Sequence, residues 1–486
     1  MQDITFQSLQ ASVAIPEIFL ALAACLILMV GLFVSKENSD RVCYVLSLFA
    51  LVATAGLIIS DFSSTATLAF NGMFIDDAMA DLLKIAMCLI SAAAFVYSQQ
   101  YNQDRQLFKS EYYILGLFAV TGMMVMASSN HLLTLYLGLE LMSLCLYAMI
   151  AFYRDDRLAT ESAMKYFVLG ALASAILLYG MSLLYGLTGS LYLNEITQSL
   201  AGADQGNVAI ALAVVFVVVA LAFKLGAVPF HMWVPDVYHG APTSTTAFIG
   251  AAPKIAAFAM IMRLLVGGLD SLHHMWQDML IILAILSVGV GNIIAIAQDN
   301  FKRMLAYSTI SHMGFFLFGI LSGSAIGYSA ALFYVLIYAV MSLAAFGLIL
   351  FLAREGYESD NLNDLKGLSK RHPWSALLML ILMFSMAGIP PTAGFFAKLS
   401  VIQALINAGL IWVAAVAVIL AVVGAFYYLR VIKLVYFDQP ESEEPISAKW
   451  DFQLVLSVNV LMILAILPWV DSLLSLCGQV IQQLAV

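Results

Sequence analysis

The chain has 486 residues, of which 63% are hydrophobic and only 10% are charged, whereas about 25% of residues are charged in a typical soluble domain. This composition excludes an ordinary soluble protein and leaves room for many membrane spans of about 20 residues each. The net charge of -9 comes without a basic stripe, so we expect no binding of nucleic acid.

The N-terminal sequence MQDITFQSLQ has no basic residue before the first apolar run. We therefore expect neither a secretory signal nor a transit peptide, and we expect the first span to be retained. The five cysteines are scattered in or beside apolar segments. They match no metal-binding spacing and no disulfide framework, so we interpret them as small packing residues.

Fourteen apolar segments are predicted to cross the bilayer, all as helices, because a span in lipid must satisfy its own backbone hydrogen bonds. In chain order, the predicted spans are 14–34, 42–60, 73–97, 111–129, 131–153, 160–186, 208–230, 244–266, 275–297, 301–322, 326–352, 374–405, 408–437 and 451–477. The sequence therefore predicts an all-α polytopic membrane protein.

The positions of the basic residues predict how the spans are oriented. Fifteen of the 21 Lys and Arg residues lie in odd-numbered loops or in the ends of the spans next to those loops. The even-numbered loops and both tails hold none. The positive-inside rule then places the odd-numbered loops in the cytoplasm and both termini on the outer side of the membrane.

The seventh and twelfth spans are predicted to be discontinuous. The seventh contains FKLGAVPFHMWVPDVYHGAP, with Lys224 five residues before Pro229. The twelfth contains FSMAGIPPTAGFFAK, with Lys398 seven residues after Pro391. A proline removes a helical hydrogen bond and frees a carbonyl group. Ordinary proline kinks, which are common in membrane helices, are the alternative interpretation.

The two breaks are five spans apart, so two copies of a five-helix unit would enter the membrane in opposite directions, as in inverted-repeat transporters. We therefore predict two inverted repeats, formed by helices 4–8 and 9–13. The predicted regions are an N-terminal three-helix segment at 1–110, a first repeat at 111–270, a second repeat at 271–440 and a C-terminal helix 14 at 441–486.

Six basic residues lie inside the predicted spans, where a charge costs about 2.5–3.5 kcal/mol and usually marks an ion path. They are Lys84, Lys165, Lys224, Lys254, Arg263 and Lys398, and one buried acid, Glu140, accompanies them. Lysine suits proton transfer better than arginine, because arginine does not deprotonate in proteins. Lys224, Lys254 and Lys398 lie in separate spans and are predicted to hold exchangeable protons.

Glu140 and Lys165 are predicted to form an ion pair, because they lie in the neighbouring fifth and sixth spans. Glu161, one helical turn before Lys165, is expected to share this lysine. The alternative is a fixed structural pair that joins two helices.

The other two buried cations are expected near the outer surface. Lys84 is predicted to pair with Asp81 or Asp77, and Arg263 is predicted to extend its charged group to the outer end of the eighth span.

Polar side chains are predicted to link the lysines as a secondary proton path. In NFKRMLAYSTISHMG, Tyr307 and Ser311 share one helix face, and His312 lies near the membrane centre, where it can relay protons. His231 follows the break in the seventh span, and Tyr428 lies in the thirteenth. Hydrogen-bonded packing is the alternative for each histidine, and an interfacial position is the alternative for the tyrosine.

The sequence contains no phosphate-binding lysine loop, no dinucleotide-binding glycine motif, no cysteine cluster for iron–sulfur and no paired histidines for haem. Any redox reaction or ATP hydrolysis that drives this chain is therefore expected to take place in other proteins.

Five segments resemble the antiporter-like membrane subunits of respiratory complex I: LYLGLELMSL, SAMKYFVLGALASA, FKLGAVPFHMWVPDVYHGAP, NFKRMLAYSTISHMG and AGIPPTAGFFAK. The resemblance covers essentially all fourteen spans. The chain is most similar to the subunit N family in its length, in Lys398 rather than an acid in the twelfth span, and in YYLRVIKLVYF of the thirteenth. It also lacks the long lateral helix that another of these subunits carries.

The resemblance implies a role for each matching residue. Glu140 and Lys165 would sense the neighbouring subunit and gate proton uptake. Lys224 would hold the central proton, Lys254 would relay it, and Lys398 would release it toward the periplasm.

The resemblance also implies that this chain is a non-redox, proton-translocating subunit of NADH:quinone oxidoreductase in the bacterial inner membrane. It implies no cofactor in this chain, with FMN, iron–sulfur clusters and quinone in partner subunits. The expected partners are small membrane subunits and an adjacent antiporter-like subunit. A subunit of a multi-chain sodium/proton antiporter is the alternative. A stand-alone solute carrier fits less well, because the sequence predicts no polar pocket beyond one proton line.

Overall fold

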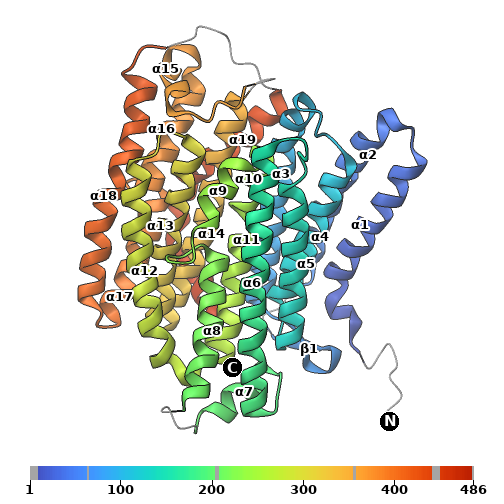
Figure 1. Ribbon diagram of the computed structural model, residues 1–486, viewed down its shortest axis with the longest axis vertical. Helices are drawn as coiled ribbons and strands as arrows, with labels where there is room; N and C mark the ends of the chain where they lie inside the picture. The colour runs from blue at the N-terminus through green and yellow to red at the C-terminus, as the bar shows by residue number, and fades with distance from the viewer. Residues whose placement is uncertain (1–8, 63–64, 203–206, 354–356, 441–448, 484–486) are drawn as a thin grey trace.

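The computed structural model describes residues 9–62, 65–202, 207–353, 357–440 and 449–483. Long helices stand side by side along the vertical axis of the molecule (Figure 1). The first half of the chain contains, in order, η1 Ala11–Ala14, α1 Ile15–Phe33, α2 Lys36–Ser60, β1 Thr67–Ala69, η2 Phe70–Gly72, β2 Phe74–Asp76, α3 Ala78–Asp104, α4 Ser110–Ala127, α5 Leu132–Ile150, α6 Arg157–Thr188, α7 Leu193–Leu200, α8 Val208–Leu225, α9 Trp233–Gly240, α10 Thr243–Ile249, α11 Ala252–Ile261 and η3 Met262–Gly268.

The second half repeats the pattern of long helices interrupted by short ones. Its elements are η4 Asp270–Leu272, α12 His273–Ile296, α13 Phe301–Leu321, α14 Ala325–Leu352, η5 Leu362–Leu365, α15 Leu368–Arg371, α16 Pro373–Ala387, α17 Ala393–Asn407, α18 Ile411–Tyr436, α19 Trp450–Ala465, η6 Leu467–Trp469 and α20 Val470–Gln482.

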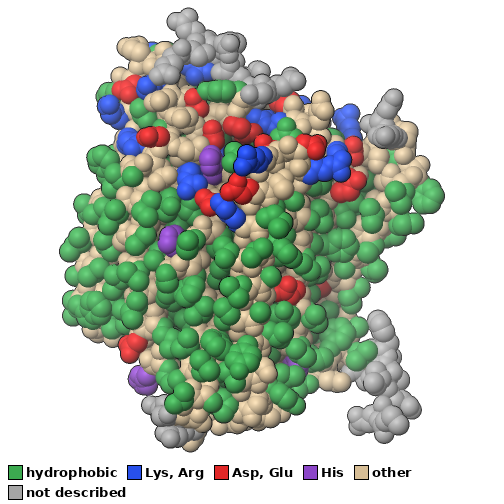
Figure 2. Space-filling model, in the orientation of Figure 1, with side chains coloured by type: hydrophobic (Ala, Val, Ile, Leu, Met, Phe, Trp, Pro, Cys, Tyr) green, Lys and Arg blue, Asp and Glu red, His purple; other side chains and the backbone are tan. Residues whose placement is uncertain are grey.

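A broad apolar belt surrounds the bundle, and charged side chains gather above it at the end that carries α15 (Figure 2). We call this end the charged end, and we call the end with α7 and β1 the opposite end. Large apolar side chains in the belt are exposed, among them Phe33, Phe49, Leu137 and Val422. Exposed apolar surface on this scale is expected where lipid or another membrane protein covers the molecule.

Among the described residues, twelve helices are long and apolar enough to cross a membrane, or thirteen if the bent pair α19 and α20 forms one span. The predicted twelfth span is two helices of 15 residues each, α16 and α17. This confirms the polytopic helical fold and explains why fewer single helices than predicted spans are long enough.

Two local features differ from the prediction of helices alone. β1 and β2 form a small antiparallel hairpin in which Thr67 pairs with Asp76, so the third span begins at Ala78 rather than at 73. The eighth span is also interrupted, because α10 ends at Ile249 and α11 begins at Ala252 with Pro253 in its first turn. Proline there removes a backbone donor and permits the break.

The breaks in the seventh and twelfth spans have the same backbone form. α8 ends at Gly226 with φ +78°, and α16 ends at Gly388 with φ +83°. In each break the residue after the glycine donates its amide to a carbonyl five residues earlier, from Ala227 to Ala222 and from Ile389 to Phe384. In both breaks, the glycine that caps the helix has a left-handed backbone conformation. Glycine adopts this conformation without a steric penalty because it has no Cβ.

Two buried ion pairs hold the N-terminal helices in place, and they correct the prediction for Lys84. Lys84 is fully buried and contacts Glu17 in α1 at 2.7 Å and Asp76 at 3.3 Å. Asp77, one of the two predicted partners, pairs with Arg263 instead, whereas the charge of Asp81, the other, does act on Lys84. Glu140 was predicted to be the one buried acid, but it is only partly buried, whereas Glu17 is only 5% exposed.

Arg263 does not extend to the membrane surface as predicted. Its guanidinium is buried and binds both carboxylate oxygens of Asp77, at 2.7 and 2.9 Å, and its Nε donates to the carbonyl of Ala127 at 3.0 Å. A bidentate partner at the start of α3 holds the side chain inside the protein. The pair joins α3 and α4 to η3.

Candidate proton-transfer site

Lys224, in the last turn of α8, occupies a buried position between helices. Its Nζ donates to the hydroxyl of Ser143 in α5 at 2.9 Å and lies 6.0 Å from the centre of the Phe223 ring. Ser143 is three residues after Glu140, so the two face the same side of α5. Lys224 and Glu140 therefore interact electrostatically across this hydroxyl.

Glu140 and Lys165 do not form the predicted ion pair. Glu140 accepts a hydrogen bond from Ser174 in α6. Lys165 is nine residues before Ser174, or about 13 Å along α6 at about 1.5 Å per residue. Lys165 is 43% exposed and contacts Glu161 at 2.9 Å and Asp236 at 2.8 Å. The expected contact with Glu161 is confirmed, and the neighbouring position of α5 and α6 does not bring the predicted pair together.

Lys254 and Lys398 occupy equivalent chemical surroundings at the helix breaks. Lys254 Nζ donates to the carbonyl of Leu225, the last residue of α8, at 2.8 Å. Lys398 Nζ donates to the carbonyls of Met386 and Ala387, the last residues of α16, at 2.9 Å each. The C-terminal end of a helix carries partial negative charge and carbonyls without intrahelical donors. Each broken helix therefore offers a cation site in the apolar interior.

Aromatic rings complete the surroundings of both lysines. Lys254 Nζ lies 5.3 Å from the centre of the Trp233 ring, and Lys398 Nζ lies 5.2 Å from that of Phe315. Trp233 is itself fixed by a hydrogen bond of 2.9 Å from its indole N–H to the carbonyl of Phe223. Ring faces at this distance attract an ammonium group, so each lysine is held by carbonyls and a ring rather than by a carboxylate.

His312 lies at the centre of a buried hydroxyl cluster in the second half. Its Nδ1 is 2.6 Å from the hydroxyl of Tyr334, and its Nε2 is 3.1 Å from that of Tyr428. Tyr428 also bonds Ser308 at 2.5 Å. Lys398 interacts electrostatically with His312. The predicted residues His312 and Tyr428 therefore meet in one hydrogen-bonded network, and the charge of Lys398 acts on it.

The other predicted relay residues lie outside this cluster. Tyr307 and Ser311 lie where α13 packs closely against Gly291 of α12. A Cβ built at Gly291 would lie 2.8 Å from the backbone nitrogen of Ser311. His231 is half-buried between α8 and α9, and its Nδ1 has no hydrogen-bond partner among the described residues. The sequence pattern correctly identified α13 as the helix that carries the network. The face that Tyr307 and Ser311 share, however, is not the face on which the network lies.

Asp236, in α9, joins the two halves of the chain at the charged end. One carboxylate oxygen binds Lys165 at 2.8 Å, and the other binds Arg303 of α13 at 2.9 Å. Partial burial acts to raise the pKa of Asp236, but hydrogen bonds from Lys165 and Arg303 outweigh it, and the pKa lies below its usual value. Asp236 is therefore an ionised bridge.

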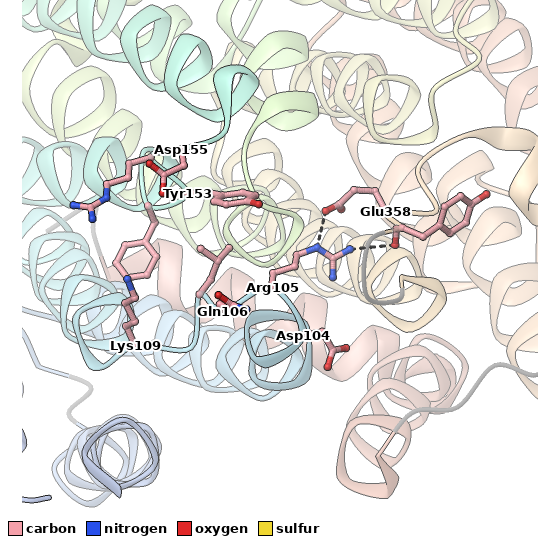
Figure 3. A pocket seen from close by; sticks show the side chains of 11 residues that line it. Asp104, Arg105, Gln106, Lys109, Tyr153, Asp155 and Glu358 are labelled. Carbon is pink, nitrogen blue, oxygen red and sulfur yellow. Dashed lines mark hydrogen bonds and ion pairs between the residues drawn. The ribbon is translucent and has the colours of Figure 1, made fainter. Parts of the chain in front are cut away.

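A second polar cluster at the charged end centres on Glu358, which follows α14. Its carboxylate accepts hydrogen bonds from the Tyr101 hydroxyl at 2.7 Å, Arg105 Nε at 2.8 Å and Thr243 Oγ1 at 3.0 Å. Figure 3 shows Arg105 pointing toward Glu358 across the wall of a hollow. The hollow has a volume of about 620 Å³ and is also lined by Lys109, Asp155 and neighbouring residues.

Sequence reasoning missed Ser143, Asp236, Glu358 and Lys302. Asp236 and Glu358 were outside the predicted spans, so nothing singled them out as partners of buried groups. A serine in an apolar helix, such as Ser143 three residues after Glu140, is a signal that could have been used. Lys302 lies at the very start of a predicted span and was therefore counted with the residues of the preceding loop. In the structure it is only 3% exposed.

Comparison with known proteins supports the resemblance found in the sequence. The model for the family described as "NADH:quinone oxidoreductase/Mrp antiporter, TM" matches residues 129–424. NADH-quinone oxidoreductase subunit N of Thioalkalivibrio sulfidiphilus is 56% identical over 473 residues, which are 97% of this chain and 98% of that one. The subunit N of Thiobacillus denitrificans is 55% identical, with the same coverage.

Solved structures give the same fold. A chain of "Respiratory complex I from Thermus thermophilus with bound Aureothin" has a TM-score of 0.81 and 30% identity, covering 95% of this chain and 98% of that one. A chain of the Mrp complex from a Dietzia species has a TM-score of 0.83 over 98% of both chains, but at 23% identity it shows the fold alone. The matched family model and the near full-length relatives show that this chain belongs to the NADH-quinone oxidoreductase subunit N family.

Proposed function

We propose that this chain is the proton-translocating subunit N of a respiratory complex I, in which NADH:quinone electron transfer elsewhere in the complex drives proton transfer through the chain. The observation that carries the proposal is the set of buried lysines at the helix breaks. Lys224, Lys254 and Lys398 are each at most 9% exposed, and none of them directly contacts a carboxylate of the described residues. A lysine without a fixed counter-ion can release and regain its proton when a neighbouring charge moves.

The first half of the path consists of Glu140, Lys224 and Lys254. Glu140 senses charge on the side of the chain that faces a neighbouring subunit, and it acts on Lys224 across Ser143. Lys165 is the outer member of this site, where it moves between Asp236 and Glu161 and alters the field at Glu140. Lys224 holds the central proton and Lys254 relays it toward the second half.

Lys398 is the releasing group of the second half. The network of His312 and Tyr428 supports this role, because it offers hydroxyl and imidazole groups that can pass protons. Tyr307, Ser311 and His231 are secondary members, and water is required between them, since no direct bonds join them to the central cluster.

We also propose the topology that this function requires. Fourteen spans, with α16 plus α17 and α19 plus α20 as broken spans, place both termini in the periplasm of the bacterial inner membrane. The repeats comprise 111–270 and 271–440, after the N-terminal three-helix segment 1–110 and before helix 14 at 441–486. The matching left-handed ends at Gly226 and Gly388 support the pairing of these two repeats.

The partners follow from the same proposal. The chain supplies no redox group for electron transfer, so FMN, iron–sulfur clusters and quinone are expected in other subunits of the complex. Small membrane subunits and an adjacent antiporter-like subunit are expected against the exposed side of α5 and α6, where Leu137 and Lys165 lie.

The test of the proposal is Lys224→Ala in the assembled complex, reconstituted in liposomes. Proton pumping is expected to fall much more than the amount of assembled complex, because the substitution removes the central proton site. Lys433→Ala is the matched control, since Lys433 is 68% exposed at the end of α18. An assembled Lys224→Ala complex that pumps protons at the normal ratio to NADH oxidised would overturn the assignment.

The alternative function is a subunit of a multi-chain sodium/proton antiporter. The shared fold with the Mrp complex chain favours it, but the full-length identity to subunit N relatives favours complex I. The purified assembly separates the two. Ion transport by the chain without NADH-oxidising subunits would support the antiporter, whereas co-purification with those subunits would support complex I.

A further inference from the structure

Lys302, in the first turn of α13, is a buried lysine that the proposed path does not use. Its Nζ donates to the carbonyl of Ala241, at the C-terminal end of α9, at 2.9 Å. This is the arrangement seen for Lys254 at the end of α8 and for Lys398 at the end of α16. Lys302 differs from them in its position at the charged end, beneath the loop that follows α14.

Glu358 is partly exposed and interacts electrostatically with the buried Lys302. Three donors from two segments of the chain fix its carboxylate: Tyr101 and Arg105 at the C-terminal end of α3, and Thr243 of α10. Burial acts to raise the pKa of Glu358, but the charges of Lys302 and Arg105 outweigh it, and the pKa lies below its usual value. The carboxylate is therefore ionised at neutral pH and ready to accept a proton.

Water reaches Glu358 through the hollow at the charged end. Figure 3 shows Glu358 and Arg105 together in its wall, with Asp155 and Lys109 at a distance from them. Its volume of about 620 Å³ is large enough to admit water. Glu358 is thus the one described carboxylate that both borders this water and interacts with the buried Lys302.

On the inner side of Lys302, polar groups continue along α13. The Tyr338 hydroxyl donates to Thr309 Oγ1 at 2.9 Å, and the ring of Tyr338 lies 5.2 Å from that of His312. Thr309 is seven residues after Lys302, which is two turns along the same face of α13. The helix therefore places polar groups at two depths between the charged end and the His312 cluster, with about 10 Å along the helix between Lys302 and Thr309.

We propose that Glu358 and Lys302 form the proton input of this chain at its charged end, an inference that rests on the proposed function. The Glu358 carboxylate accepts a proton from water in the hollow and becomes a neutral acid. It then gives this proton to the neutral amine of Lys302, which becomes an ammonium, and Glu358 is ionised again. Lys302 passes the proton inward along α13 and returns to the amine.

The charged groups around Lys302 allow this exchange. Glu358, Asp360 and Asp156 favour its ammonium form, and Arg105 opposes it. Arg105 also binds Glu358 directly at 2.8 Å, so it limits how long the acid keeps its proton. A purely structural role, in which the Arg105–Glu358 pair only fastens the loop after α14 to α3, is the competing explanation that the experiment must separate.

The test uses Lys302→Arg and Glu358→Gln in the complete complex in liposomes. Lys302→Arg keeps the positive charge but cannot deprotonate, so proton pumping is expected to fall about tenfold or more while assembly is retained. Glu358→Gln keeps the size of the side chain and is expected to slow pumping likewise. Acidifying the solution at the charged end should partly restore the rate, whereas Glu358→Asp should retain it.

Glu111→Gln is the matched control, because Glu111 is exposed at the charged end and does not line the hollow. Normal pumping by assembled Lys302→Arg and Glu358→Gln complexes would overturn the input assignment. If the Lys302→Arg complex pumps protons as fast as the unchanged complex, then a positive charge at this position is sufficient. That result would show that the role of Lys302 is structural. Loss of pumping in Lys224→Ala alongside normal Glu358→Gln would overturn this inference while leaving the proposed function intact.

Discussion

At the scale of single residues, the three lysines of the proposed proton path are held by neutral oxygen atoms. Ser143 holds Lys224, and helix-end carbonyls hold Lys254 and Lys398. A buried ammonium without any acceptor would be too costly, whereas a permanent carboxylate partner would lock the proton in place. Neutral acceptors lie between these extremes and allow the proton to leave.

We predict that Ser143→Ala slows proton pumping, because Lys224 loses a hydrogen bond to a charged group worth about 1.5–3 kcal/mol. Ser143→Thr should retain most of the rate, since threonine keeps the hydroxyl. Pumping by the purified complex is the measurement. Ser329→Ala is the control, because that buried hydroxyl bonds only its own helix at Ala325. Equal rates for Ser143→Ala and the control would contradict the role of Ser143.

A second residue-scale prediction concerns acid stability. The pKa of Asp236 lies below its usual value, so the folded chain binds this proton less readily than the unfolded chain does. The stabilisation is therefore complete above the unfolded pKa of about 4 and is lost as the pH falls below it.

Asp236→Asn should lower the thermal stability at pH 7 by no more than about 1 kcal/mol, as for other partly exposed ion pairs. Its stability should also fall less on acidification than that of the unchanged chain. Thermal unfolding of the purified complex at several pH values measures both effects. A parallel acid profile for the variant and the unchanged complex would show that Asp236 does not contribute in this way.

At the scale of elements, the breaks in α8–α9 and α16–α17 position the lysines. Gly388 has φ +83°, and a Cβ built there lies 2.8 Å from Cδ of Lys398. Gly226 has φ +78°, and a Cβ there would lie 2.4 Å from Val234. In the second half of the chain, the backbone turn at Gly388 therefore lies directly against the side chain of Lys398.

Gly388→Ala should therefore displace Lys398 and reduce proton pumping, beyond the cost of about 1–2 kcal/mol for a left-handed residue with a Cβ. Gly409→Ala is the matched control, since Gly409 has φ +77° and no atom within 4 Å of the added Cβ. Pumping and assembly are measured for both variants. If the two variants pump equally well, the contact with Lys398 has no functional weight.

The sequence was sufficient to predict most elements of this fold. Long apolar runs identified the spans, and proline with glycine identified both functional breaks, because these signals are local. The hairpin at 67–76 and the break before Pro253 were missed, since short strands and one proline carry weak local signals. Side-chain pairs were predicted less well, because neighbouring helices can still place Glu140 and Lys165 at different depths.

At the scale of the whole molecule, ion pairs between distant segments assemble the bundle. Arg263 and Asp77 are 186 positions apart in the chain, and their pair joins η3 to the start of α3. Lys84 and Glu17 join α3 to α1. The N-terminal helices lie outside the residues 129–424 that the family model matches, and the pair of Arg263 with Asp77 fastens them to that matched region.

Arg263→Met should reduce the amount of folded chain in the membrane, because it leaves the Asp77 carboxylate buried without its cation, at a cost of about 3–5 kcal/mol. The double variant Arg263→Met with Asp77→Asn should recover part of the loss, since asparagine is neutral and still caps α3. Quantification of assembled complex is the measurement. Lys433→Met is the control, and a single Arg263→Met variant as abundant as this control would contradict the prediction.

The carbonyl ends of α8 and α16 have a consequence for ion discrimination. Oxygen atoms at the ends of broken membrane helices are ligands that transporters use for sodium. In this chain, Lys254 and Lys398 occupy those oxygens with a cation that is covalently tethered. The nitrogen can lose a proton but cannot leave, so an alkali ion finds its ligands already taken. A sodium ion would therefore have to displace a tethered ammonium group before it could reach these oxygens.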